Sequence, residues 1–257
     1  MTAAVFKPNE LALFQRDGYR IVRALVAPEV CARMKALAQQ HLAARVAPLE
    51  YETDVQYPGA PASRDAPGGR TVRRLLQAAA RDALFHDFAT APAIAARILQ
   101  LLGAPALLSQ SHHNCMMTKD PRHSSLTHWH RDIRYWAFEK AELVSVWLAL
   151  GREHLSNGCL LLLPGSHVMR FRDDQLDAAK FLRTDLDENS VLLQSQITAE
   201  LDPGDVLFFH SRLFHAAGNN QSTDTKFSLV FTYHAQSNHP VPGTRSAALP
   251  SIALAGT

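Results

Sequence analysis

The chain has 257 residues, of which 47% are apolar, and its 26 Lys and Arg nearly balance its 24 Asp and Glu. This length allows one domain with a sizeable core, and scattered basic residues at a net charge of +2 argue against nucleic-acid and membrane-surface binding. Three widely spaced cysteines without a Cys-x-x-Cys pair argue against a disulfide framework and a thiolate zinc site. We expect no secretory leader and no membrane span, and therefore a cytoplasmic protein.

Helical patterns dominate residues 1–104. Asn9 is expected to cap a first helix that ends at Gly18, and a second helix is expected to begin near Pro28. A third helix is expected over residues 92–102, where apolar residues recur at helical spacing. The sequence therefore predicts a mostly helical envelope in this part of the chain.

Residues 48–70 contain several prolines and glycines, which break up regular structure. A loop of this length inside a compact domain is either a disordered excursion or a functional element. In the functional interpretation it is a lid, and Tyr51, Tyr57, Arg64 or Arg70 reaches a substrate.

Short apolar segments separated by turn signals dominate residues 105–240. Many short strands with such turns favour a sandwich or barrel over a parallel α/β sheet. We expect strands over residues 107–117, 143–150, 159–163, 206–209 and 227–233. The charged segment 170–189 is expected to be a helix-friendly insert and residues 241–257 a tail, all within a single domain over residues 1–257.

Candidate metal ligands lie in two parts of this strand region. His130 and Asp132 are two residues apart and share one face if the segment is a strand, and His128 has the same parity. A third ligand is available from His210 or His215. Two histidines and one carboxylate leave coordination positions open, which suits Fe(II) that binds a co-substrate and dioxygen, whereas a structural zinc site needs four protein ligands.

Lys226 and Ser228 place a cation and a hydroxyl on one face of the last expected strand. These are the groups that the far carboxylate of a dicarboxylate such as 2-oxoglutarate needs. The alternative is a surface lysine on an edge strand, and the neighbouring histidines favour the first interpretation.

The chain resembles the phytanoyl-CoA dioxygenase family of Fe(II)/2-oxoglutarate oxygenases. The resemblance runs through residues 14–19, 130–132, 156–160, 163–167, 203–210 and 215–222. It implies a mainly β fold, with a double-stranded β-helix (jelly-roll, cupin-like) core and N-terminal helices packed outside. It also implies a dioxygenase that hydroxylates a small organic molecule with release of succinate and CO2, and it assigns His130, Asp132 and His215 as Fe(II) ligands.

The resemblance also implies a co-substrate pocket. It places Trp147 in the wall of the 2-oxoglutarate site, Cys115 beside it, and Arg73 in contact with the co-substrate. The family usually has Arg where this chain has Lys226, and Lys offers a point charge in place of a two-pronged fork. Accordingly, either Arg73 or Arg74 shares the anchoring, or the affinity for the co-substrate or its identity is altered.

The remaining expectations concern the substrate and partners. Arg134 shares the face of the ligands if strand parity holds and would contact an anionic group, with Arg131 and His128 as further candidates. Related halogenases lack the carboxylate ligand, so Asp132 favours hydroxylation. We expect dioxygen as co-substrate, ascorbate as a supporting reductant, a small-molecule substrate, no nucleic-acid or membrane partner, and a monomer or dimer.

Two other classes of protein remain open on the sequence. One is a non-catalytic, cupin-like sensor or binding protein that holds a metal without turnover. The other is a zinc hydrolase, which is disfavoured because no glutamate base stands beside the metal motif and because it gives Lys226 and Ser228 no task.

Overall fold

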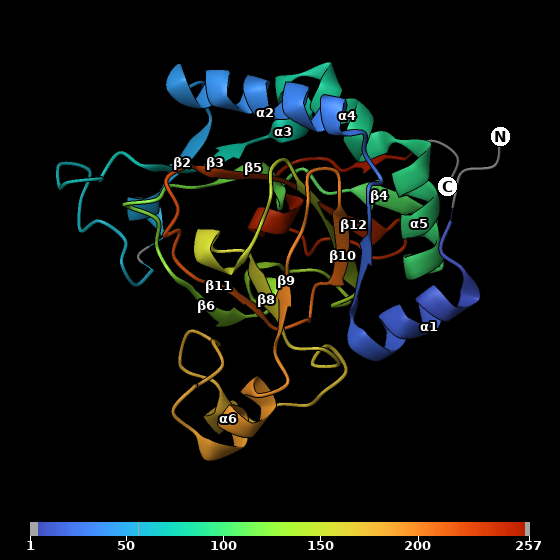
Figure 1. Ribbon diagram of the computed structural model, residues 1–257. Coiled ribbons are helices and arrows are strands. Elements are labelled where there is room, and N and C mark those ends of the chain that lie inside the picture. The colour runs from blue at the N-terminus through green and yellow to red at the C-terminus, as the bar shows by residue number, and fades with distance from the viewer. Residues whose placement is uncertain (1–4, 56, 255–257) are drawn as a thin grey trace.

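Two antiparallel β-sheets face one another at the centre of the molecule, with most helices outside the larger sheet (Figure 1). This computed structural model describes residues 5–55 and 57–254. The expected mainly β fold with helices packed outside is confirmed. No helix of the described residues is both long and apolar enough to cross a membrane.

Nine strands of the described chain form the larger sheet. Seven of them lie in the spatial order β1 (Tyr19–Val22), β10 (Val206–His210), β7 (Leu143–Ala149), β12 (Lys226–Ala235), β5 (Asn114–Lys119), β3 (Val72–Leu76) and β2 (Leu49–Tyr51). The other two are β4 (Ala106–Leu108), which pairs with β12, and β13 (Ile252–Ala253), which pairs with β4. The smaller sheet has the order β6 (Thr127–His130), β11 (His215–Ala217), β8 (Leu160–Leu162) and β9 (Ile197–Ala199).

Most helices cover the outer face of the larger sheet, and helix α6 lies on the side of the smaller sheet that faces away from the larger one (Figure 1). The α-helices are α1 (Pro8–Asp17), α2 (Pro28–Ala43), α3 (Ala78–Arg81), α4 (Ala83–Thr90), α5 (Pro92–Leu102) and α6 (Asp187–Leu193). The 3-10 helices are η1 (Glu52–Asp54), η2 (Asp132–Tyr135), η3 (Leu155–Asn157), η4 (Asp173–Gln175) and η5 (Arg245–Ala247). Helix α6 belongs to the segment that packs beyond β6, β8 and β11.

The burial pattern of β7 shows how the layers are built. All seven of its residues are buried, because helices cover one face of the sheet and the smaller sheet covers the other. Val144, Val146 and Leu148 pack in the apolar cluster beneath the helices. Trp147 and Ala149 point the other way, into the cluster between the two sheets. The alternation follows from the period of two along a strand and directs Trp147 toward the interior.

A proline begins helix α1 and a glycine ends helix α5. Helix α1 begins at Pro8, so Asn9 lies inside it and the prediction of an Asn9 cap is wrong. A proline at the first helical position has no N–H to satisfy, and Glu10 accepts a hydrogen bond from the Lys7 backbone at 2.9 Å. Helix α5 has the predicted bounds, and Gly103 ends it in the left-handed conformation at φ 65°.

Several expected segments are divided differently. The expected strand over residues 107–117 is two strands, β4 and β5, separated by a bend, and the 170–189 insert consists of turns and loops with η4 and the first turn of α6. The N-terminal third supplies β1, β2 and β3 as well as helices, and the C-terminal tail supplies β13. These strands were missed because each has only two to five residues, which is too short to show a clear period of two.

Asp205 fixes the turn that leads into β10. Its side chain is 5% exposed and accepts hydrogen bonds from the backbone N–H of Ala24 at 2.8 Å and of Asp202 at 2.9 Å, and from Arg23 at 2.6 Å. Burial opposes ionisation, but these hydrogen bonds lower the pKa of Asp205 below its ordinary value.

We expect Asp205→Ala to lower the free energy of unfolding by about 2 kcal/mol at neutral pH, because buried N–H groups lose their acceptor. The exposed Asp202 provides the control, and Asp202→Ala should change stability by less than about 0.5 kcal/mol. Since the pKa of Asp205 is lowered, its contribution should be full above the pKa of an unfolded aspartate and should be lost progressively as the pH falls from there through the lowered pKa. Urea unfolding of the three proteins at neutral and acidic pH measures both effects, and equal stabilities at neutral pH would contradict this role.

Candidate metal centre and adjoining cavities

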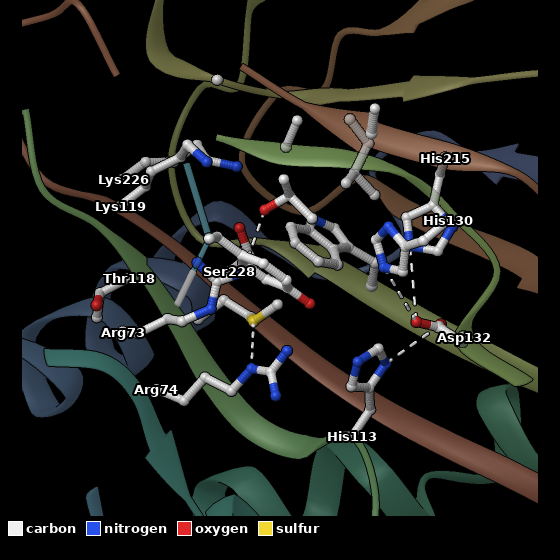
Figure 2. A pocket seen from close by; sticks show the side chains of 18 residues that line it. Arg73, Arg74, His113, Thr118, Lys119, His130, Asp132, His215, Lys226 and Ser228 are labelled. Carbon is white, nitrogen blue, oxygen red and sulfur yellow. Dashed lines mark hydrogen bonds and ion pairs between the residues drawn. The ribbon is translucent and has the colours of Figure 1, made fainter. Parts of the chain in front are cut away.

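His130, Asp132 and His215 converge between the two sheets (Figure 2). His130 and His215 are paired residues of β6 and β11, and their ring centroids are 4.3 Å apart. Asp132 Oδ1 lies 3.8 Å from His130 Nε2 and 3.6 Å from His215 Nε2. All three are buried, and one ligand atom of each lies within 4.8 Å of the others. The structure thus brings the three predicted residues together and gives His210 a different place.

Backbone carbonyls orient both imidazoles. His130 Nδ1 lies 2.8 Å from the carbonyl oxygen of His128, and His215 Nδ1 lies 3.0 Å from that of Leu213. A carbonyl only accepts, so each Nδ1 carries the proton and each Nε2 keeps its lone pair free. Burial, followed by the neighbouring His215, lowers the pKa of His130 well below its ordinary value, so the ring stays neutral. Both rings therefore present the form that a metal binds.

The Asp132 carboxylate has no cationic side chain within 4 Å among the described residues. Its neighbours are His113, His130 and His215, and it accepts a hydrogen bond from Ser145 at 3.3 Å. Burial raises the pKa of Asp132, as expected for a carboxyl that lacks a counter-charge. A divalent cation would supply that charge, so the donor set fits Fe(II) with two neutral imidazoles and one carboxylate.

The path between His130 and Asp132 is not a regular strand. The pairing of β6 with β11 shifts register between His215 and Ala217, and Asp132 opens the 3-10 helix η2. Regular strand parity, on which the placement of Arg134 and His128 beside the ligands depended, therefore does not hold here, and their contact with a substrate stays a prediction. Arg134 lies over the rings of Tyr135 and Phe181, and His128 contributes its backbone carbonyl.

Arg131 has a packing role. Its guanidinium lies 5.0 Å from the ring centroid of Phe214 and 5.7 Å from that of Phe171. It is not among the described residues that line the two cavities beside the metal centre. His210 is likewise engaged elsewhere, with Nε2 2.8 Å from Glu142.

A small cavity extends from the metal centre between the sheets, and Lys226, Ser228, Trp147 and Arg73 line it as expected. The first three already bind an internal carboxylate. Glu153, which is 1% exposed, lies 3.1 Å from Lys226 Nζ and accepts from Ser228 Oγ at 2.6 Å and Trp147 Nε1 at 3.0 Å. Neither Glu153 nor its partner set was anticipated.

Arg73 lines the small cavity but is already paired, and Cys115 does not line it. Arg73 is held by Glu52 at 3.1 Å and by Ser125 at 2.9 Å, so most of its charge is satisfied. Cys115 lines the neighbouring, larger cavity, and Met117 lines the small one.

The larger cavity has a volume of about 700 Å³ and shares Tyr57, Arg74 and His113 with the small one. Tyr57 comes from the Pro/Gly-rich loop, and its ring packs edge-on against Phe181 at 5.9 Å. Its hydroxyl bonds to that of Tyr135. The loop therefore forms a wall of the cavity through Tyr57, in line with the lid interpretation.

Two further cavity residues were not predicted as site residues. Lys119 is buried and lines the small cavity, and His113 lies 3.5 Å from the outer oxygen of Asp132. Sequence patterns gave no signal for Lys119, since a lysine before Asp-Pro is ordinarily a solvated turn residue. His113 falls within the strand expected over residues 107–117, but it lies in the bend between β4 and β5, which local sequence patterns did not indicate.

Comparison with known proteins gives concordant matches. The family described as "Phytanoyl-CoA dioxygenase (PhyH)" matches residues 14–228. A probable phytanoyl-CoA dioxygenase of Caenorhabditis elegans is 23% identical over 241 residues, covering 90% of this chain and 76% of the relative. An ectoine dioxygenase of Nocardia farcinica is 24% identical over 248 residues, covering 90% and 78%.

Among solved structures, the epimerase SnoN in complex with Fe3+, alpha ketoglutarate and nogalamycin RO superposes with a TM-score of 0.71. It is 21% identical, and the match covers 96% of this chain and 94% of that one. At this identity the likeness establishes the shared fold.

His215→Ala should reduce Fe(II) binding by at least about a hundredfold, because it removes a donor atom that no neighbour replaces. His210→Ala is the matched control and should keep near-normal affinity, since His210 pairs with Glu142. Anaerobic calorimetry with Fe(II) and metal analysis of the dialysed proteins measure the difference. Loss of iron in His210→Ala with retention in His215→Ala would reverse the assignment.

Proposed function

The chain belongs to the phytanoyl-CoA dioxygenase family, and we propose that it is an Fe(II)- and 2-oxoglutarate-dependent oxygenase that hydroxylates a small organic molecule. The single observation that carries the proposal is the buried group of His130, Asp132 and His215. Its two free Nε2 atoms and one uncompensated carboxylate line the small cavity, which adjoins the larger cavity at Tyr57, Arg74 and His113. That arrangement provides three protein ligands and leaves space for a co-substrate on one side and a substrate on the other.

The chemistry of the bound groups is that of the cofactor. When bound, iron with 2-oxoglutarate and dioxygen supplies the oxidant that converts a C–H bond to C–OH, with succinate and CO2 as co-products. The triad would hold the metal, and Ser145 positions Asp132 through a hydrogen bond to its outer oxygen. The apolar cluster between the sheets and the wall formed by Tyr57 exclude water from the reacting carbon.

The larger cavity supports a substrate that carries an anionic group. Arg134 and Arg245 line it, and neither makes an ion pair within residues 5–55 and 57–254, whereas Arg74 lies 3.4 Å from Glu50. The guanidinium of Arg134 is 4.0 Å from the Phe181 ring, whose centroid is 6.1 Å from that of His130. An anionic group bound by Arg134 would therefore be separated from His130 by the Phe181 ring. The rest of the substrate would contact the aromatic side chains of the larger cavity.

The predicted cytoplasmic location also stays part of this proposal. The three cysteines are free and buried, which is compatible with a reducing compartment. Cell fractionation with a tagged protein would test it.

Succinate formation tests the proposed reaction. The iron-loaded protein should release succinate and CO2 from 2-oxoglutarate, slowly without substrate and faster with it, and Asp132→Ala should lower that rate at least about a hundredfold because the carboxylate ligand is lost. Succinate measured by mass spectrometry gives the rate. Absence of succinate from the iron-loaded wild-type protein at every 2-oxoglutarate concentration would disprove the proposal.

Substrate charge is tested with a panel of metabolites scored by stimulation of succinate release. Active compounds should carry a carboxylate or phosphate, and Arg134→Gln should raise their KM by roughly tenfold or more, because an ion-paired hydrogen bond is lost. Arg131→Gln is the matched control, since Arg131 packs on Phe214 away from the cavity. Neutral substrates with an unchanged KM in Arg134→Gln would contradict this assignment.

A further inference from the structure

Two lysines lie side by side at the end of the small cavity that is farthest from the metal centre (Figure 2). Lys119 of β5 and Lys226 of β12 are directly opposite each other in the antiparallel pairing, and both are 8% exposed. Like charges opposite one another weaken a strand pair, and burial increases their cost. A negatively charged group between the two lysines would therefore stabilise this pair of strands.

Glu153 supplies one negative charge, and it is fully engaged. It lies 3.1 Å from Lys226 and accepts the hydroxyl proton of Ser228 and the indole N–H of Trp147. A carboxylate only accepts, so the single O–H of Ser228 is committed to Glu153. Ser228 thus cannot donate to a bound co-substrate while this contact persists.

Lys119 lacks a carboxylate partner among the described residues. Its Nζ donates to the backbone oxygen of Ser125 at 3.1 Å. The nearby Glu52 is already bound by Arg73 at 3.1 Å and by Ser125 at 2.6 Å. Burial, then the charges of Lys226 and Arg73, lowers the pKa of Lys119 to about 7, against a smaller opposing effect of Glu52.

The backbone beside Lys119 is shaped to its side chain. Gly158, of the Asn157-Gly158-Cys159 turn, has φ +72°, and a Cβ there would lie 2.7 Å from Lys119 Cε and 2.5 Å from the Gly218 carbonyl oxygen. A glycine is required by both the conformation and the close approach. The turn leaves room for the lysine stem to reach the cavity.

We propose that Lys119 and Lys226 together bind the distal carboxylate of 2-oxoglutarate. Glu153 lowers the net charge of the three side chains so that it balances a single carboxylate. Two ammonium groups and one carboxylate leave one positive charge, which the distal carboxylate neutralises. The proposal rests on the proposed function and refines it. Ser228 becomes a residue that positions Glu153, and Lys119 takes the place expected for a second anchoring group.

Discrimination between two 2-oxo acids tests the proposal. 2-Oxobutyrate has the same chelating end as 2-oxoglutarate but lacks the distal carboxylate. Lys119→Met removes the charge and keeps an unbranched apolar stem, so it should weaken 2-oxoglutarate binding roughly tenfold or more and leave 2-oxobutyrate unchanged. Lys119→Arg should restore most of the loss. Anaerobic titration of the iron-loaded protein, followed by its visible absorption band and by calorimetry, measures each affinity without turnover.

The exposed lysine variant Lys140→Met is the control and should bind both acids like the wild type. Unchanged 2-oxoglutarate affinity in Lys119→Met, or equal losses for both acids, would overturn the role of Lys119. If the iron-loaded wild type binds neither acid, the proposed function itself fails, and that result differs from the other two.

A pH series adds a second readout. Binding of the carboxylate favours the ammonium form of Lys119, so affinity for 2-oxoglutarate is full below the pKa of free Lys119 and falls as pH rises through its raised value in the complex. Lys119→Arg should remove this decline, because arginine stays charged. Affinity for 2-oxobutyrate serves as the reference at each pH. The same pH dependence in wild type and Lys119→Arg would count against the proposal.

Discussion

The pairing of β12 with β5 on one side and β7 on the other is the interaction on which the site depends. It sets Lys226 opposite Lys119 and Ser228 opposite both Met117 and Ala149, so the inward face of three neighbouring strands becomes one wall of the small cavity. A slip of one residue would turn that face toward the helices, where the core is apolar. The apolar packing on both faces of β7 therefore fixes the chemistry as well as the fold.

Buried charge is distributed unevenly along this wall. The metal end has a carboxylate without a cationic side chain, and the opposite end has two lysines for one glutamate. Each end is costly alone, because isolated charges are expensive in a protein interior. A divalent cation at one end and a dicarboxylate that reaches the other would neutralise both. The free energy that these buried charges cost the folded protein would thus favour binding of the metal and the co-substrate. Functional sites commonly have such an arrangement.

The residue pattern predicted a β sandwich or barrel and paired His130 with Asp132, whereas the jelly-roll core and the choice of His215 over His210 came from the family resemblance. The pattern did not predict how the three ligands converge, since the register shift in β6 and the 3-10 helix at Asp132 depend on tertiary packing. Lys119 escaped notice because its relation to Lys226 is a matter of register between distant strands. Glu153 escaped because a glutamate within Gly-Arg-Glu-His is typical of an exposed loop, whereas its backbone pairs with Leu201 and carries the side chain inward.

The two histidines of the triad lie on β6 and β11, which belong to the sheet with the shorter strands and fewer interstrand hydrogen bonds. A metal held by both would act as a cross-link between chain segments that are far apart in the sequence, closing a long loop in the manner of a disulfide. Iron would thus stiffen the weaker half of the sandwich as well as serve its chemistry. In the metal-free protein this half should open first, so amide exchange there would report how fully a preparation is loaded.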